Sequence, residues 1–90
     1  MVEMRCFVTG KVQGVRYRDY VVTTAEELGV FGYVKNQSDG SVLVVAQGEP
    51  DTLKEMVECL HEGSLLARVD GVSVDWGTAG VTYDDFSLLQ

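Results

Sequence analysis

The chain is poor in the residues that build metal clusters and disulfide frameworks. Its 90 residues include two cysteines, one histidine and one proline. Cys6 and Cys59 lie far apart in the sequence and form no CxxC pair, which argues against a zinc site. We interpret both as buried or half-buried thiols rather than a disulfide, and we expect no metal and no cofactor.

Long apolar runs are also missing. No run approaches the roughly 20 residues that a membrane span requires. Residues 1–8 alternate polar and apolar side chains, whereas a signal peptide needs a continuous apolar segment. No linker, internal repeat or low-complexity segment interrupts the chain, and its length suits one modest core. We therefore expect a single soluble domain over residues 1–90, not exported and located in the cytoplasm.

Positive charge is scarce. Seven lysines and arginines stand against fourteen aspartates and glutamates, for a net charge of -7. General binding to nucleic-acid backbones or anionic membranes depends on accumulated positive charge and is excluded on this ground. Any basic function must be local, and we expect neither a nucleic-acid nor a membrane partner. We also expect a monomer that acts on a small-molecule ligand.

The hydrophobic periodicity changes along the chain between that of strands and that of helices. It predicts strands over residues 2–9, 31–37, 41–47 and 72–76, helices over residues 18–28 and from Pro50 to Gly63, and a possible short fifth strand over residues 86–89. The order β-α-β-β-α-β is typical of a ferredoxin-like α+β sandwich, with two helices on one face of an antiparallel sheet.

This topology makes a geometric prediction. In a split β-α-β unit the first two strands run parallel with the third inserted between them, so their carboxyl ends emerge at the same edge. At about 4.8 Å per strand spacing these ends are roughly 10 Å apart. The turn over residues 10–17 and the end of the second strand near Asn36 should therefore be neighbours.

The stretch GKVQGVRYR leads from the first strand into the first helix. The first amides of a helix lack acceptors within it, and Gly14 lets the backbone curl so that successive amides form a nest for an oxyanion. Arg18 can close such a site with paired donors. The alternative is an ordinary turn with solvated arginines. The stretch matches neither a Walker A loop nor GxGxxG.

Two segments carry a resemblance to a known family. GKVQGVRYR, followed by GYVKNQSDGSVLVVAQG, resembles the two signature segments of the acylphosphatases, small enzymes with the sandwich fold expected above. The fixed positions of both signatures are met, and ARVDGVSVDW is similar to the family's fourth-strand region. The likeness covers essentially the whole chain.

The resemblance implies roles for individual residues. It makes Arg18 the phosphate-binding catalytic arginine and Asn36 the residue that orients the attacking water. The backbone cradle for phosphate would consist of Gln13, Gly14, Val15, Arg16, Tyr17 and Arg18. The side chain of Arg16 inherits no family role. Many members carry threonine or serine after the asparagine, where this chain has Gln37, so the sequence leaves open how Asn36 is held.

The implied reaction is hydrolysis of an acyl phosphate without a metal. The leaving carboxylate, whose conjugate acid has a pKa of roughly 4, departs without a general acid. An amide cradle, a guanidinium and a polar group holding water are then sufficient, because such transfer depends on positioning and charge stabilisation. Asparagine cannot take a proton, so the resemblance implies that a phosphate oxygen receives it.

Other candidate residues have simpler interpretations. His61 is expected at a helix end on the surface, Asp39 in a turn, and Asp84 with Asp85 in a solvated loop. Lys35 either adds positive potential to the site or simply points outward from its strand.

Two alternatives to a single-domain enzyme remain open. One is an anion-binding or regulatory domain without turnover, and the other is the acylphosphatase-like domain of larger carbamoyl-transfer proteins.

Overall fold

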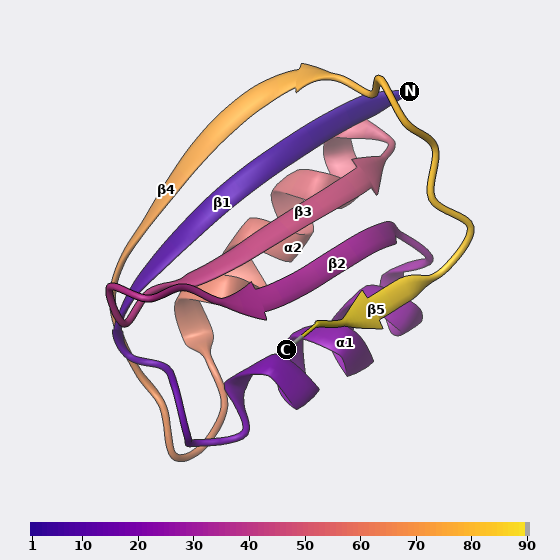
Figure 1. The fold of residues 1–90 in the computed structure, drawn as a ribbon. Helices are drawn as coiled ribbons and strands as arrows, with labels where there is room; N and C mark the ends of the chain where they lie inside the picture. Colours follow the sequence, from indigo (N-terminus) through magenta and orange to yellow (C-terminus); the bar gives the residue numbers. More distant parts are fainter. Residues whose placement is uncertain (90) are drawn as a thin grey trace.

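The computed structural model describes residues 1–89 as one five-stranded sheet with two helices (Figure 1). The elements in chain order are β1 (Val2–Lys11), α1 (Tyr17–Leu28), β2 (Phe31–Asn36), β3 (Val42–Gly48), α2 (Pro50–Glu62), β4 (Arg68–Thr78) and β5 (Phe86–Leu88). No helix within these residues is long and apolar enough to cross a membrane.

The strand order is β4-β1-β3-β2-β5. β3 runs antiparallel to both β1 and β2, so β1 and β2 are parallel to each other, which confirms the predicted split β-α-β unit. β4 pairs antiparallel with β1 at one edge of the sheet. The order of elements and the ferredoxin-like sandwich follow the sequence prediction.

The fifth strand departs from the expectation of a purely antiparallel sheet. β5 pairs parallel with β2, with Gly32 opposite Phe86, so the sheet is mixed. The cause is the segment over residues 79–85, which crosses the end of the sheet from the β4 edge to the β2 edge (Figure 1). The chain therefore enters β5 at the end where β2 begins, and both strands run in the same direction.

Several predicted boundaries also shift: β1 extends to Lys11, β2 ends at Asn36, and β3 begins and ends one residue later than predicted. β4 is longer than the alternating stretch over residues 72–76. Its main chain pairs with β1 from Arg68 to Thr78, and this pairing does not depend on alternating polar and apolar side chains. The first helix begins at Tyr17, one residue earlier than predicted. The differences in β4 and α1 both extend an element beyond the part that its apolar periodicity marks.

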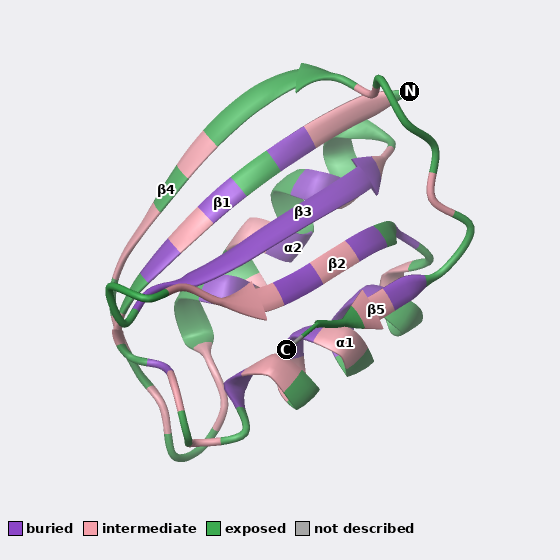
Figure 2. Ribbon diagram, in the orientation of Figure 1, coloured by how far each residue is buried: buried purple, intermediate pink, exposed green. Residues whose placement is uncertain are grey.

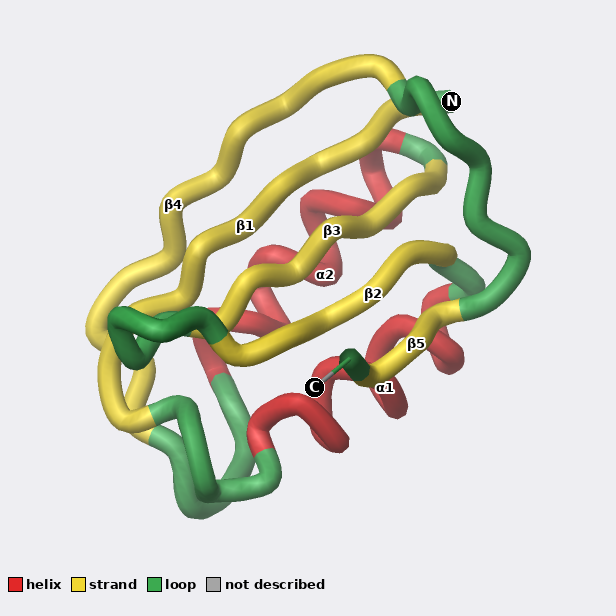
Figure 3. Tube along the Cα trace, in the orientation of Figure 1, coloured by secondary structure: helices red, strands yellow, loops and turns green. Residues whose placement is uncertain are grey.

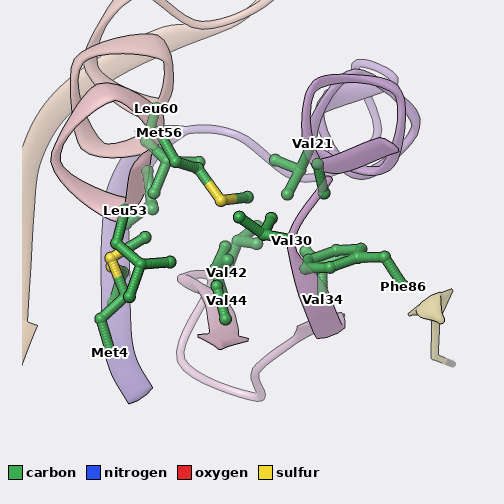
Figure 4. Packing of buried hydrophobic residues seen from close by; sticks show 14 of the residues in the cluster. Met4, Val21, Val30, Val34, Val42, Val44, Leu53, Met56, Leu60 and Phe86 are labelled. Atoms are coloured by element: carbon green, nitrogen blue, oxygen red, sulfur yellow. The ribbon is translucent and has the colours of Figure 1, made fainter. Parts of the chain in front are cut away.

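Both helices cover the same face of the sheet and form the core with it (Figures 1 and 4). Val21 of α1 and Met56 of α2 point toward Val44 on the central strand (Figure 4). The stripe that α2 turns to the sheet consists of Leu53, Met56 and Leu60, all fully buried. This is the three- and four-residue spacing of an amphipathic helix, and burial of these side chains is the main stabilising term.

The central strand β3 is buried along its length, whereas much of the edge strand β4 is exposed (Figure 2). On the helix-free face, the side chain of Gln47 is fully buried and donates from Nε2 to Glu3 Oε1 at 2.9 Å and to the carbonyl of Val81. Its Oε1 accepts from the N–H of Tyr83 at 3.2 Å. Gln47 thus fastens the segment that leads to β5.

Replacement of Gly32 by alanine should strongly destabilise the protein. Gly32 has φ 144°, and a Cβ there would overlap the carbonyl oxygen of Val45 on β3. Combined backbone strain and overlap should lower the free energy of unfolding by roughly 3 kcal/mol or more in urea titrations. Gly77→Ala, where an added Cβ meets nothing within 4 Å, is the control and should change it by no more than about 0.5 kcal/mol. Equal losses in the two variants would contradict this account.

Candidate active site

The β1–α1 loop and the end of β2 lie close together, as the topology predicts. Figure 3 shows the β1–α1, β2–β3 and α2–β4 loops gathered at one end of the molecule. Gln13 Nε2 donates to the carbonyl oxygens of Gln37 and Ser41, both at 2.8 Å. Because Gln37 directly follows Asn36, these bonds join the loop to the strand end that carries the predicted catalytic asparagine.

The loop contains two residues with a positive φ. Gly14 adopts φ 73° and Arg16 adopts φ 62° and ψ 22°, both in the left-handed region. Among residues 1–89, Arg16 alone of the non-glycine residues has a positive φ. It is the N-cap of α1, and no side chain caps this helix end. The first amides of α1 therefore remain available to an external acceptor, and the helix dipole makes an anion favourable there.

Buried side chains on either side hold the loop in place. Val12 and Tyr17 are each only 1 % exposed. The hydroxyl of Tyr17 donates to the carbonyl of Leu60 at the end of α2, at 2.7 Å. Burial raises the pKa of Tyr17, so the phenol stays protonated and keeps donating at any physiological pH. The loop thus takes its shape from the core on which it rests.

A pocket of about 250 Å³ opens at the start of α1. It is lined by Val12, Gly14, Arg16, Tyr17, Arg18, Asp19 and Leu88. Four of the six predicted cradle residues thus line one pocket. Gln13, Val15 and Asn36 do not; Gln13 is instead engaged with the β2–β3 turn.

Arg18 is positioned by the last residues of the described chain. Its Nη1 donates to the carbonyl oxygen of Leu89 at 2.6 Å, and the N–H of Leu89 donates to the carbonyl of Val34 on β2 at 2.9 Å. Leu88 and Leu89 were not singled out from the sequence. The apolar pattern there predicts a strand, but it contains no sign that this strand lies beside α1.

Asn36 is the last residue of β2. By alternation along the strand, its side chain is on the same face as the buried Val34, which is the face covered by the helices. Its carboxamide oxygen Oδ1 is buried and has no hydrogen-bond partner within residues 1–89. Buried acceptors are almost always satisfied in folded proteins, so this unpartnered atom is a candidate acceptor for a bound group.

The comparison with known proteins decides the family to which the chain belongs. A family model described as Acylphosphatase matches residues 4–88. The chain belongs to the acylphosphatase family. Acylphosphatases are enzymes that hydrolyse acyl phosphates, so the chain is an enzyme of that type.

Individual acylphosphatases agree with this assignment. That of Salinibacter ruber is 44% identical over 83 residues, which cover 92% of this chain and 87% of the relative. The crystal structure of the Bacillus subtilis acylphosphatase superposes with a TM-score of 0.96 at 33% identity and covers 100% of both chains. The acylphosphatase structure from Coxiella burnetii has a TM-score of 0.91 at 40% identity, over 97% of this chain and 90% of that one.

The same fold occurs inside a longer protein. The crystal structure of HypF from T. kodakarensis matches with a TM-score of 0.88 and 28% identity over 99% of this chain, which is 12% of the HypF chain. The same fold can thus form one part of a longer chain.

The remaining candidate residues lie outside the pocket at the start of α1. His61 is exposed in the last turn of α2, and Asp84 and Asp85 are exposed in the segment before β5. Asp39 is a turn residue whose Oδ1 accepts from the N–H and the hydroxyl of Ser41, which lowers its pKa. Within residues 1–89, no group of three or more histidines, cysteines or acidic residues is arranged to hold a metal ion.

Lys35 lies on β2, half-buried and opposite Leu43 on β3. By alternation it is on the helix-free face, the side of the sheet opposite Asn36.

Among the described residues, a larger hollow of about 450 Å³ opens at the other end of the molecule, between the end of α1 and the start of α2. It contains none of the residues that the sequence singled out for catalysis.

Both cysteines are free thiols, and Cys6 should be unreactive in the folded protein. Burial, followed by the charge of Asp75, raises the pKa of Cys6 from 9.0 to about 12. A thiol-specific reagent at pH 8 should label the half-buried Cys59 in the folded protein and Cys6 only after unfolding, as mass spectrometry of the peptides would show. Equal labelling rates for both cysteines before unfolding would contradict this.

The raised pKa of Cys6 also makes the free energy of unfolding depend on pH. The folded state holds the Cys6 proton more tightly than the unfolded state does. The resulting contribution to the free energy of unfolding is therefore complete below about pH 9 and is lost as the pH rises toward 12.

Proposed function

We propose that this enzyme hydrolyses acyl phosphates by direct attack of water on phosphorus, with Arg18 and Asn36 as its catalytic residues. The observation that supports this most is the placement of two groups at one end of the sheet. Arg18 lines a pocket at the uncapped start of α1, and Asn36 places an unpartnered carboxamide oxygen at the end of β2. Gln13 joins the two segments that carry them.

The phosphate group would bind to the backbone of the loop. The proposed donors are the main-chain amides of Gln13, Gly14, Val15, Arg16, Tyr17 and Arg18. The two residues with positive φ would let the amides of this short loop converge on an anion, and the dipole of α1 would add about half a positive charge. The guanidinium of Arg18 contributes further donors, with a charge that is constant at physiological pH.

The attacking water would be held by Asn36. Its Oδ1 is a buried acceptor that can receive a hydrogen bond from the water and so orient a lone pair toward phosphorus. A carboxamide does not act as a base. The water proton therefore passes to a non-bridging phosphate oxygen, which becomes part of the inorganic phosphate released.

The bonds and electrons balance without another reactant. A bond forms between the water oxygen and phosphorus, and the bond between phosphorus and the bridging oxygen breaks. The electron pair leaves with the carboxylate, which is a weak base and needs no general acid. Charge on the phosphoryl group is met by amides and a guanidinium that are already in place, so the barrier falls through electrostatic preorganisation.

Substitutions at three polar positions test the assignment. Arg18→Ala should raise KM and lower kcat, because the guanidinium is proposed to bind phosphate in both the substrate and the transition state. Asn36→Ala should lower kcat by roughly a hundredfold or more with little change in KM, since it would leave the water unoriented. The measurement is steady-state hydrolysis of a simple acyl phosphate.

Arg16→Ala is the matched control. It removes an arginine two residues from Arg18 whose backbone, rather than its side chain, is proposed to serve the cradle, so kcat and KM should stay within about twofold. A loss at Arg16 as large as that at Arg18 would show that the roles of the two arginines are reversed. A wild-type protein that binds inorganic phosphate but does not turn over acyl phosphate would instead be an anion-binding domain.

Removal of divalent metals should leave the rate unchanged. The proposed charge stabilisation comes from the protein, so hydrolysis in excess EDTA should proceed at the rate measured without it. Loss of activity that returns on addition of Mg²⁺ would overturn the metal-free mechanism.

A further inference from the structure

We propose that the side chain of Gln13 is a positioning residue that couples the phosphate cradle to the water-holding Asn36. This inference rests on the proposed function, because it assigns Gln13 a part in the same reaction. Gln13 would act through the β2–β3 turn and would not touch the substrate with its side chain. Its backbone amide belongs to the proposed cradle, whereas its carboxamide points to the other half of the site.

The bonds of Gln13 span the base of the β2–β3 turn. Nε2 donates to the carbonyl of Gln37 and to that of Ser41, each at 2.8 Å. The N–H of Gln37 also donates to the carbonyl of Ser41 at 2.8 Å. One amide group of the cradle loop therefore ties together the two residues at which the turn leaves β2 and approaches β3.

The chemistry of these acceptors decides which end of the Gln13 carboxamide faces them. Carbonyl oxygens only accept hydrogen bonds, so the NH₂ group with its two protons must point at the turn. Glutamate has nearly the same shape but presents two acceptors. At neutral pH, a glutamate at this position would hold a negative charge against two carbonyl oxygens and would release the turn.

Asn36 depends on this turn because its own side chain lacks an anchor. Its Oδ1 has no partner within the described chain, so its direction follows from the backbone at the end of β2, where Asn36 stands opposite Val42. The next residue, Gln37, is one of the two that Gln13 holds. A shift of this backbone would move the proposed water relative to phosphorus, and a misplacement of about 1 Å can reduce a rate roughly a hundredfold.

This arrangement also explains why Gln37 is tolerated after Asn36. The hydrogen bonds of Gln37 within residues 1–89 are made by its main-chain N–H and C=O. The turn is thus fastened by Gln13 from the opposite loop and does not require a hydroxyl side chain at position 37.

The deciding experiment is Gln13→Glu, assayed with an acyl phosphate and with inorganic phosphate as a competitive inhibitor. We expect kcat to fall about tenfold to a hundredfold, through the displaced water, while the inhibition constant of inorganic phosphate rises by no more than about threefold. In the Asn36→Ala background the same substitution should cost less than about threefold in kcat, because the residue that it positions is already gone.

Two control variants separate positioning from loss of fold. Gln47→Met removes a fully buried amide with several hydrogen bonds at the other end of the sheet, so it should lower the melting temperature without changing kcat by more than about twofold. Gln37→Ala keeps the main-chain bonds and should also leave kcat within about twofold.

If Gln13→Glu does not fold, Gln13→Met is the replacement variant. It removes the two N–H donors without adding charge, and the same changes in kcat and in phosphate inhibition are expected.

A readout that is independent of activity is amide hydrogen exchange at the turn. Loss of the Gln13 bonds should accelerate exchange at the N–H groups of Gln37 and Gly40 by about tenfold, while amides of the central strand stay protected. Unchanged exchange would overturn the structural part of the proposal.

Two kinetic outcomes would overturn the functional part. In one, phosphate inhibition weakens as much as kcat falls, which would place the damage in the cradle. In the other, the losses at Gln13 and Asn36 multiply, which would show independent roles. A wild type that does not hydrolyse acyl phosphates would instead refute the proposed function, and the exchange measurement would still test the contact.

Discussion

The insertion of β3 between β1 and β2 is the constraint on which the rest of the structure depends. Because β3 is antiparallel to both neighbours, β1 and β2 run in the same direction and end at the same edge of the sheet. The loop into α1 and the turn after Asn36 are therefore brought together although more than twenty residues separate them in the chain. β3 can occupy this place because its residues 42–46 are apolar and buried on both faces, and its one polar side chain, that of Gln47, is buried with its hydrogen bonds satisfied.

A local source of positive potential reconciles the site with the acidity of the chain. The net charge is -7, yet the pocket at the start of α1 lies at an uncapped helix start and is lined by two arginines, Arg16 and Arg18, against one acidic residue, Asp19. Amides at a helix start attract an anion within the first turn, whereas the field of surface carboxylates is screened within about 8–10 Å in physiological salt. A single phosphate can therefore be bound without a basic surface.

The two ends of the sheet are connected through a few polar side chains. Gln47 fastens the segment that carries the chain across the sheet to β5, and β5 brings the carbonyl of Leu89 to Arg18. At the other end of the sheet, the side chain of Gln13 donates hydrogen bonds from the β1–α1 loop to two carbonyls of the β2–β3 turn. Both glutamines donate to main-chain carbonyls from partly or fully buried positions, where a hydrogen bond is stronger than in water and its loss is more costly.

The sequence by itself determined the order of the elements, the face that each buries and the two segments that are proposed to form the site. Alternation in β1 and the three- and four-residue spacing in α2 report burial directly, and Gly14, Arg18 and Asn36 occur in long, specific signatures. These are properties of side chains along one segment, so they can be deduced without a partner.

Only the tertiary structure decided which segments come into contact through their main chains, because such contacts leave no pattern of side chains in the sequence. The parallel pairing of β5, the extension of β4 and the contact between Arg18 and Leu89 all use main-chain groups of the partner. Every residue except proline offers the same N–H and C=O groups, so the sequence does not mark which strand or side chain will use them. For the same reason the sequence predicts a role for the backbone of Gln13 in the cradle, but it does not reveal that the side chain of Gln13 donates to two carbonyls of the opposite turn.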